Sequence, residues 1–497
     1  MLSRIKTFSE VNLNFLTPQS HAFHLDLPPA SCYRSLYLRT QGCGALSLSV
    51  ADKLATVCAT LNEYPHIRYL SSSPACKEVA ELLHERLNAF IGNNKDWWYH
   101  GGQGHAERER GTLTITDRRE DPLSPIIHEF TYQAMCQDLL PMEEDKISYE
   151  AEAGGAKGEP RDVLLNDNDE LWRELKGSHI ADVITTLSDR IRSFVSTNSG
   201  AALAKDSGSD MSLGEMAAAL KHLPEYKETM AKLSQHMHIS HMCMDQFNKT
   251  SMMEVAELEQ TMATGTDSDG KALKTSALVD ELIDALAMIS GSEMKLRLIM
   301  IYIISQQGIK EEDRKRLFDA AGFNPDEIEQ VLALDKIGVT LQSAPPKKSM
   351  LGSMFKRATK LAAGRSDKDS VYSMSRYSTA LKSVLTDIQA GKLSEEDYPS
   401  IMPLPVQGDM GGSVRSARRG GGKAAAESRW GSNEGSGAAA KKKFTGGRQI
   451  VFVVGGVTYS EVRGAYESMK EGSKEVVVGG TSFITPADFL AGLEALK

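Results

Sequence analysis

The sequence predicts an α/β domain built on a parallel sheet, split between the two ends of the chain, with a large and mostly helical insertion between the two parts. Short apolar runs typical of buried strands alternate with helical patterns near both ends, whereas the middle shows helical periodicity almost throughout. With 497 residues, the chain exceeds what one hydrophobic core usually holds. We therefore expect two or three domains.

Residues 1–140 are predicted to form the first part of the α/β domain. Phe23, Leu25 and Leu27 alternate with polar residues, as expected of a strand with one buried face. The other predicted elements of this part are the strands 66–70 and 112–116 and the helices 48–63 and 79–90. Strands that alternate with helices indicate a parallel sheet.

Residues 449–497 are predicted to form the second part of the same domain. The nearly continuous apolar run 449–454 is typical of a strand with both faces covered. It is followed by a helix at 459–470, a strand at 475–478 and a helix at 486–497. We expect both parts to share one sheet, which makes the block between them a rigid insertion.

Residues 141–400 are predicted to form a mostly helical domain with a hairpin at about 210–275, because apolar residues recur three and four positions apart. The predicted helices are 170–196, 213–263, 277–290, 293–307, 311–321 and 325–334. Residues 401–448 form a low-complexity linker that is too poor in apolar residues to offset the entropy of ordering.

The segment 111–149 connects the strand 112–116 to the helical domain. Ser124 and Pro125 predict the start of a helix of about four turns, since serine caps free amides and proline suits the first helical position. Its apolar stripe consists of Ile126, Ile127, Phe130, Ala134 and Met135. We expect an ordered, charged loop between the strand and this helix.

The string DRREDPLSPIIHEFTYQAMCQDLLP at 117–141 resembles the hallmark segment of the Sec/Munc family, the syntaxin-binding regulators of SNARE-driven membrane fusion. The stretches VLLNDNDELWRELKGSHIADV at 163–183 and IVFVVGGVTYSEVRGAYE at 450–467 agree as well, and the resemblance is greatest to the exocytic branch. The signature positions, which we expect to be structural, are Asp117, Arg118, Asp121, Pro122, Pro125, His128 and Glu129.

The resemblance implies an arch-like, non-enzymatic protein that binds syntaxin, a Q-SNARE, and templates its assembly with the vesicle R-SNARE during docking and exocytosis. It implies no cofactor, no metal and no catalytic residue. We expect a cytoplasmic monomer, recruited through syntaxin to plasma or secretory-vesicle membranes. Family members begin with a further α/β domain of somewhat over a hundred residues, and we expect this chain to start after it.

The helix predicted from residue 213 carries an apolar stripe that ordinary core packing or a partner helix could cover. An interior proline removes a backbone hydrogen bond, so we expect Pro224 to kink or interrupt this helix. Met230 and Met237 lie seven residues apart on one face, and methionines suit adaptable helix contacts. The resemblance places the segment in a SNARE-binding hairpin. The partner-binding residues that it implies are Leu220, Leu223, Pro224, Tyr226, Met230, Leu233 and Met237.

Two patterns suggest a metal site without completing one. His128 and Glu129 begin a zinc-protease motif, but Tyr132 stands where the second histidine belongs, which excludes that class. The acidic run 167–169 lacks the glycine and the bidentate glutamate of a calcium loop, so we expect these residues to cap the following helix.

Two further clusters favour structural roles. Gly455 and Gly456 follow a strand without the residues of a phosphate loop, which favours a tight turn into the next helix. His236, His238, His241 and Cys243 favour an interface stripe over a metal site. An α/β enzyme or ligand-binding protein that uses a cleft at the strand ends is the alternative function, although we recognise no nucleophile, base or phosphate loop.

Charge and apolar content narrow the classes of partner. The net charge of −9 argues against a general nucleic-acid binder and favours protein partners. The basic amphipathic segment 347–365 is expected to be a solvated helix, with weak membrane contact as the alternative. The sequence contains no apolar run of about eighteen residues that would span a bilayer.

Overall fold

The structure is a computed structural model that describes residues 13–94, 109–150, 160–203, 213–249, 252–272, 275–343, 372, 374–403, 444 and 446–497. Its main sheet has six strands in the order β1-β2-β9-β8-β4-β3. The strands are β1 (Leu16–Gln19), β2 (Ala22–His24), β3 (His66–Tyr69), β4 (Thr112–Asp117), β8 (Gln449–Val454) and β9 (Val476–Gly480). Strand β1 pairs antiparallel with β2, and the other neighbouring strands pair parallel.

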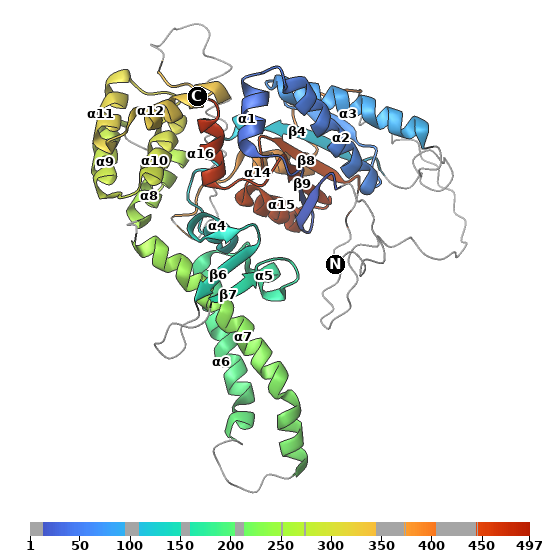
Figure 1. Cartoon of the computed structure of the whole chain (residues 1–497), viewed down its shortest axis with the longest axis vertical. Coiled ribbons are helices and arrows are strands. Elements are labelled where there is room, and N and C mark those ends of the chain that lie inside the picture. The colour runs from blue at the N-terminus through green and yellow to red at the C-terminus, as the bar shows by residue number, and fades with distance from the viewer. Residues whose placement is uncertain are drawn as a thin grey trace, which may run out of the picture.

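The two ends of the chain share this sheet, as the sequence predicted. Strand β8 lies between β4 and β9, and Ile450 pairs with Leu113 on one side and with Val477 on the other. A strand from the C-terminal part is therefore enclosed by its neighbours at the centre of the sheet (Figure 1). The segment between β4 and β8 is consequently anchored at both ends.

Helices cover both faces of the sheet, which explains why β8 is apolar at successive positions. Ile450, Phe452 and Val454 belong to the core formed with α1 (Pro29–Tyr37), α2 (Cys43–Thr60), α3 (Pro74–Asn93) and α16 (Pro486–Glu494). Val451 and Val453 face α14 (Ala380–Ala390) and α15 (Tyr459–Glu471). By its packing α14 joins this layer, although the sequence assigned residues up to 400 to the helical domain.

The β3 edge of the sheet is covered by the segment that follows α14. The Ile401 amide donates to the Ile67 carbonyl at 2.9 Å, and the Tyr69 amide donates to the Pro399 carbonyl at 3.2 Å. Arg68 also donates from Nε to the Tyr398 carbonyl at 2.8 Å. These bonds satisfy backbone groups that an open edge strand would expose.

The insertion contains a helical lobe and a projecting hairpin (Figure 1). The lobe consists of α8 (Met252–Thr264), α9 (Thr275–Met288), α10 (Ser292–Ser305), α11 (Glu311–Ala321) and α12 (Pro325–Leu332). Helices α9 to α12 lie close to the predicted ranges. The hairpin consists of α6 (Ile180–Leu203) and α7 (Leu213–Lys249), which point away from the rest of the molecule (Figure 1). It therefore begins earlier and ends earlier than the predicted hairpin at about 210–275, because α6 supplies its first arm and α8 belongs to the lobe. At the base of the hairpin lie α4 (Tyr132–Leu139) and α5 (Glu170–Leu175).

The helix predicted from Ser124 is wrong, because α4 begins only at Tyr132. The Asp121 carboxylate accepts hydrogen bonds from the amides of Ser124, at 3.2 Å, and Ala380, at 2.8 Å. A bond from the Ile126 amide to the Leu123 carbonyl then closes a tight turn. A side-chain contact to a distant segment therefore overrides the local capping signal.

Other boundaries in the insertion also differ from the predicted ones. The helix expected at 170–196 is divided into α5 and α6. The division occurs because the carbonyls of Lys176 and Ser178 accept hydrogen bonds from amides of α4 instead of from later residues of their own helix. The helix expected at 213–263 is divided into α7 and α8, but α7 runs unbroken across Pro224, so the proline does not interrupt it. A small antiparallel sheet was missed: β5 (Met142–Glu143), β6 (Lys146–Glu150) and β7 (Pro160–Leu164).

Candidate functional site

The signature residues lie where the two parts of the sheet meet the helical insertion. Asp117 ends β4, and its carboxylate accepts hydrogen bonds from the Tyr37 hydroxyl at 2.9 Å, from the Ser73 hydroxyl, and from the Arg119 amide at 3.0 Å. The neighbouring Arg118 is buried and forms an ion pair with the buried Glu461 at the start of α15. This segment therefore binds α1, α3 and α15 through polar groups.

Asp121 and the two signature prolines continue this junction. The Asp121 carboxylate accepts from the Tyr377 hydroxyl in addition to the amides of Ser124 and Ala380. Pro122 and Pro125 are buried beside it. The turn therefore ties β4 to the segment that leads into α14.

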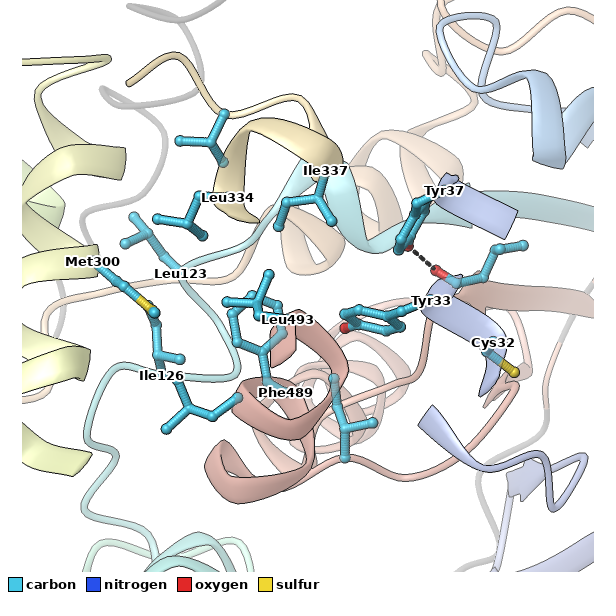
Figure 2. Close-up of a cluster of buried hydrophobic side chains, with 14 of the residues drawn as sticks. Cys32, Tyr33, Tyr37, Leu123, Ile126, Met300, Leu334, Ile337, Phe489 and Leu493 are labelled. Carbon is cyan, nitrogen blue, oxygen red and sulfur yellow. Dashed lines mark hydrogen bonds between the residues drawn. The ribbon is translucent and has the colours of Figure 1, made fainter. Parts of the chain in front are cut away.

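Apolar residues of the same turn fill the space between the lobe and the sheet. Figure 2 shows Leu123 and Ile126 in one buried cluster with Met300 of α10 and with Phe489 and Leu493 of α16. The sequence assigned Ile126 to a helical stripe, whereas the turn inserts it between two domains. The cluster joins the insertion to the α/β domain.

His128 and Glu129 each contact a side chain of another element. His128 Nδ1 lies 2.8 Å from Glu259 Oε2 in α8, and the His128 amide donates to the same carboxylate at 3.1 Å. Arg463 of α15 donates to Glu129 at 2.7 Å. Among the residues that the structure describes, no group of three or more His, Cys, Asp and Glu side chains is placed to hold a metal ion.

Arg297 and Asp138 extend this buried network into the lobe. Arg297 of α10 forms a bidentate pair with Asp138 at 2.7 and 2.9 Å, and donates to the Ile126 carbonyl at 2.8 Å. Burial alone would raise the pKa of Asp138, but Arg297 and His128 outweigh it and lower that pKa. Both groups therefore stay charged at neutral pH, and the signature segment is a charged junction between domains.

The hairpin is the part of the molecule that the sequence assigned to partner binding. Tyr226 stacks on Phe194 of α6 with ring centroids 5.0 Å apart. Met230 and Met237 are each partly buried, and Met237 packs against the core at the hairpin base, where Leu233 is 4% exposed. The side chains of Leu220, Leu223 and Pro224 lie outside the described residues.

A polar network that the sequence did not predict holds the base of α7. His236 is fully buried, with Nδ1 3.0 Å from the Tyr132 hydroxyl and Nε2 3.3 Å from Asp169. Asp169 also caps α5 by accepting from the amides of Leu171 and Trp172, as expected of the acidic run. Burial would raise the pKa of Asp169, but His236 and these amides outweigh it and lower that pKa. The unusual density of histidines was the only sequence signal for this network.

A groove of about 640 Å³ opens between α5, α6 and α7. Apolar side chains of Leu171, Phe194 and Leu233 line it. Charged residues around them include Glu170, Glu174, Arg190 and Lys232, and Arg190 is paired with Glu174. This combination of apolar and charged lining is suited to an amphipathic helix more than to a small metabolite.

The space at the ends of the central strands is largely filled. A Cβ atom on Gly455 would lie 2.3 Å from the Tyr37 hydroxyl, and one on Gly456 would lie 2.5 Å from Ile484. The backbone φ angles of 89° and 98° confirm that these glycines form a tight turn. The adjoining pocket has a volume of only about 30 Å³ and is lined by residues that include Thr458 and Thr485. This space suits a water molecule better than a substrate.

Comparison with known proteins identifies the family. A model of the Sec1 family matches residues 1–492. The chain belongs to the Sec1 family. This family is the one that the signature segment resembled, so the resemblance is confirmed.

Sec1-family relatives align along nearly the whole chain. The protein transport protein sec1 of Dictyostelium discoideum is 33% identical over 496 residues, which cover 99% of this chain and 79% of that protein. The SNARE-interacting protein KEULE of Arabidopsis thaliana is 28% identical over 533 residues, which cover 100% of this chain and 78% of that protein.

Solved structures of similar proteins support the Sec1-type fold. The Unc18–syntaxin 1 complex from Monosiga brevicollis matches with a TM-score of 0.72 at 23% identity, covering 97% of this chain and 76% of the matched chain. The protein Vps45 in complex with the Qa SNARE Tlg2 (1-310) matches with a TM-score of 0.69 at 19% identity, covering 97% of this chain and 75% of the matched chain. The expected combination of an α/β domain and a helical insertion is therefore confirmed. No helix within the described ranges is long and apolar enough to cross a membrane.

Proposed function

We propose that this chain binds syntaxin-type Q-SNARE helices and vesicle R-SNARE helices, and that it templates their assembly during vesicle docking and exocytosis. Family membership and the names of relatives support this proposal. One relative is named a SNARE-interacting protein, and two structures of similar fold are complexes with syntaxin 1 and with a Qa SNARE.

The observation that carries the proposal is the projecting hairpin. Helix α7 spans 37 residues, about 55 Å at 1.5 Å per residue, and the buried network around His236 fixes its base. Above that base, Tyr226 and Met230 keep part of their apolar surface exposed. A long helix with a partly exposed apolar stripe is typical of surfaces that bind an amphipathic helix.

The proposed mechanism is positioning without a chemical step. Two partner helices held side by side on a rigid arm lose part of their conformational freedom before they fold together, which lowers the ordering cost of assembly. The protein would act without a cofactor, as a cytoplasmic monomer recruited by syntaxin to plasma or secretory-vesicle membranes.

The domain division deduced from the sequence is part of this proposal. The sequence placed 1–140 and 449–497 in the α/β domain, 141–400 in the insertion and 401–448 in a linker. We keep this division except that α14 and the segment up to residue 401, which pack on the sheet, belong with the α/β domain. The basic segment 347–365 lies outside the described residues. Its weak membrane contact is a further proposal, tested by co-sedimentation of the full chain with vesicles that contain or lack acidic lipid.

The decisive variant is Met230→Glu. A buried charge at the centre of an apolar helix contact is costly, so we expect R-SNARE binding to weaken about tenfold or more, as measured by titration calorimetry. Ala231→Glu is the matched control, since it adds the same charge at the next, exposed position of α7. Met237→Glu should also weaken R-SNARE binding. Because the Met237 side chain packs against the core, the thermal stability of this variant must be measured as well.

Equal R-SNARE affinity of Met230→Glu and wild type, at unchanged thermal stability, would contradict the proposed contact. Equal weakening by Met230→Glu and Ala231→Glu would indicate a nonspecific effect of charge and would also count against it.

A further inference from the structure

Two cysteines from distant parts of the sequence meet at the base of the hairpin. Cys136 lies in α4 and Cys243 lies in α7, and their sulfur atoms are 3.8 Å apart. Each side chain is fully buried in the apolar cluster that supports the hairpin. All six cysteines of the chain are buried and carry free thiols.

A second contact fixes how α4 and α7 face each other. Tyr132, one turn before Cys136, hydrogen-bonds His236, which lies about two turns before Cys243. Two contacts along the same pair of helices restrict their relative rotation. The two sulfur atoms are therefore held close together, and a disulfide requires them to approach by about 1.8 Å from their separation of 3.8 Å.

We propose that Cys136 and Cys243 are a redox-responsive pair, which a peroxide converts into a disulfide that joins α4 to the hairpin helix α7. In the first step a thiolate attacks the peroxide, the O–O bond breaks, and the sulfur becomes a sulfenic acid. In the second step the other sulfur attacks it, an S–S bond forms and water leaves. Overall, two thiols and one hydrogen peroxide give one disulfide and two waters.

The surroundings of the pair determine the rate of this reaction. Burial raises the pKa of the Cys136 thiol well above its ordinary value, so little thiolate exists at neutral pH. The first step should therefore be slow and should accelerate as the pH rises. The second step is intramolecular between sulfurs already in contact, which favours the disulfide over further oxidation.

The test uses the folded full-length chain, hydrogen peroxide and mass spectrometry. We expect the protein to lose two hydrogen atoms, and proteolysis without reductant to release one linked peptide pair that contains Cys136 and Cys243. A thiol reductant should reverse the change. The oxidised form should also unfold at a higher temperature, since the link closes a loop of more than one hundred residues in the unfolded chain.

Three serine variants make the test specific. Cys136→Ser and Cys243→Ser should each abolish the linked peptide, whereas Cys58→Ser, in a buried thiol of α2, should retain it. The proposal is overturned if the native protein keeps both thiols open to alkylation after unfolding, even after prolonged exposure to peroxide at raised pH, where the first step should be fastest. It is also overturned if the disulfide joins other cysteines. None of these readouts depends on SNARE binding, so the pair and the proposed function can fail separately.

Discussion

Single charged residues join the two ends of the chain in addition to the sheet. Arg448, next to β8, donates to the Leu61 carbonyl at 2.9 Å, to Glu63 at 3.3 Å and to Glu475 at 2.9 Å. His21 Nε2 lies 3.3 Å from Glu475 on the other side. Burial would raise the pKa of Glu475, but His21 and Arg448 outweigh it and lower that pKa to about 2.

This shift predicts how stability depends on pH. Because the folded-state pKa of Glu475 lies below its ordinary value of 4.5, its stabilisation is complete above pH 4.5 and disappears as the pH falls toward 2. Glu475→Gln should lower the free energy of unfolding by about 1–3 kcal/mol at pH 7. Denaturant unfolding at several pH values should show the difference from wild type shrinking below pH 4.5.

Glu471→Gln is the control, because Glu471 is exposed at the end of the preceding helix. A difference between Glu475→Gln and wild type that stays constant from neutral to acidic pH would show that the ion pair makes no contribution.

At the scale of elements, the sequence predicted strands and helices best where local periodicity and burial agree. Strand β8 is buried throughout and apolar from Ile450 to Val454, and α15 follows it with a Thr458–Glu461 capping box. The helix predicted after Pro122 was wrong because Ser124 and Pro125 fit either the start of a helix or a turn. Hydrogen bonds from Tyr377 and Ala380 to the Asp121 carboxylate stabilise the turn instead of the helix. These two residues lie more than 250 positions away in the sequence.

The base of the hairpin also depends on contacts between distant residues, which the sequence could not predict. Sequence spacing placed Met230, Leu233 and Met237 on one helix, but it could not show that Leu233 is buried in the core and Met237 packs against it. The partners of His236 come from α4 and α5, which precede it by about 100 and 67 residues, and no local pattern marks such contacts. The binding roles of these residues stay a prediction.

Helix α7 offers a prediction at Pro224. The helix is continuous there, although proline lacks the amide that would bond the preceding turn and crowds that turn. Pro224→Ala should therefore stabilise the helix locally by up to about 3 kcal/mol. Hydrogen exchange of peptides from the upper half of α7 should slow by about ten- to a hundredfold, while peptides from α10 stay unchanged. Unchanged exchange in α7 would show that the proline costs this helix nothing.

At the scale of the whole molecule, the central position of β8 has a consequence for assembly of the fold. Its two parallel neighbours, β4 and β9, come from opposite ends of the chain. Fragments 1–403 and 444–497, expressed together, should associate and co-purify, because separation would expose the core on both faces of the sheet. Val453→Asp should prevent association, since it buries an unpaired charge. Independent migration of the unmodified fragments on size exclusion would refute this account of the fold.

The signature junction and the hairpin are linked in this architecture. The Arg118–Glu461 ion pair joins the end of β4 to α15 within the α/β domain. His128 and Asp138 of the signature segment contact Glu259 of α8 and Arg297 of α10, and the network around His236 fixes α7 to α4 and α5. The hairpin therefore extends from a body whose parts are joined by buried charges. A rigid support is what alignment of two flexible partner helices requires.

The most direct test of this account is the rate of SNARE-bundle assembly, followed by fluorescence energy transfer between labelled Q-SNARE and R-SNARE helices. The wild-type chain should accelerate assembly, Ala231→Glu should do so equally, and Met230→Glu should lose the acceleration while unfolding at the same temperature. Equal assembly rates with wild type, with Met230→Glu and without the protein would contradict the claim that the hairpin templates SNARE assembly.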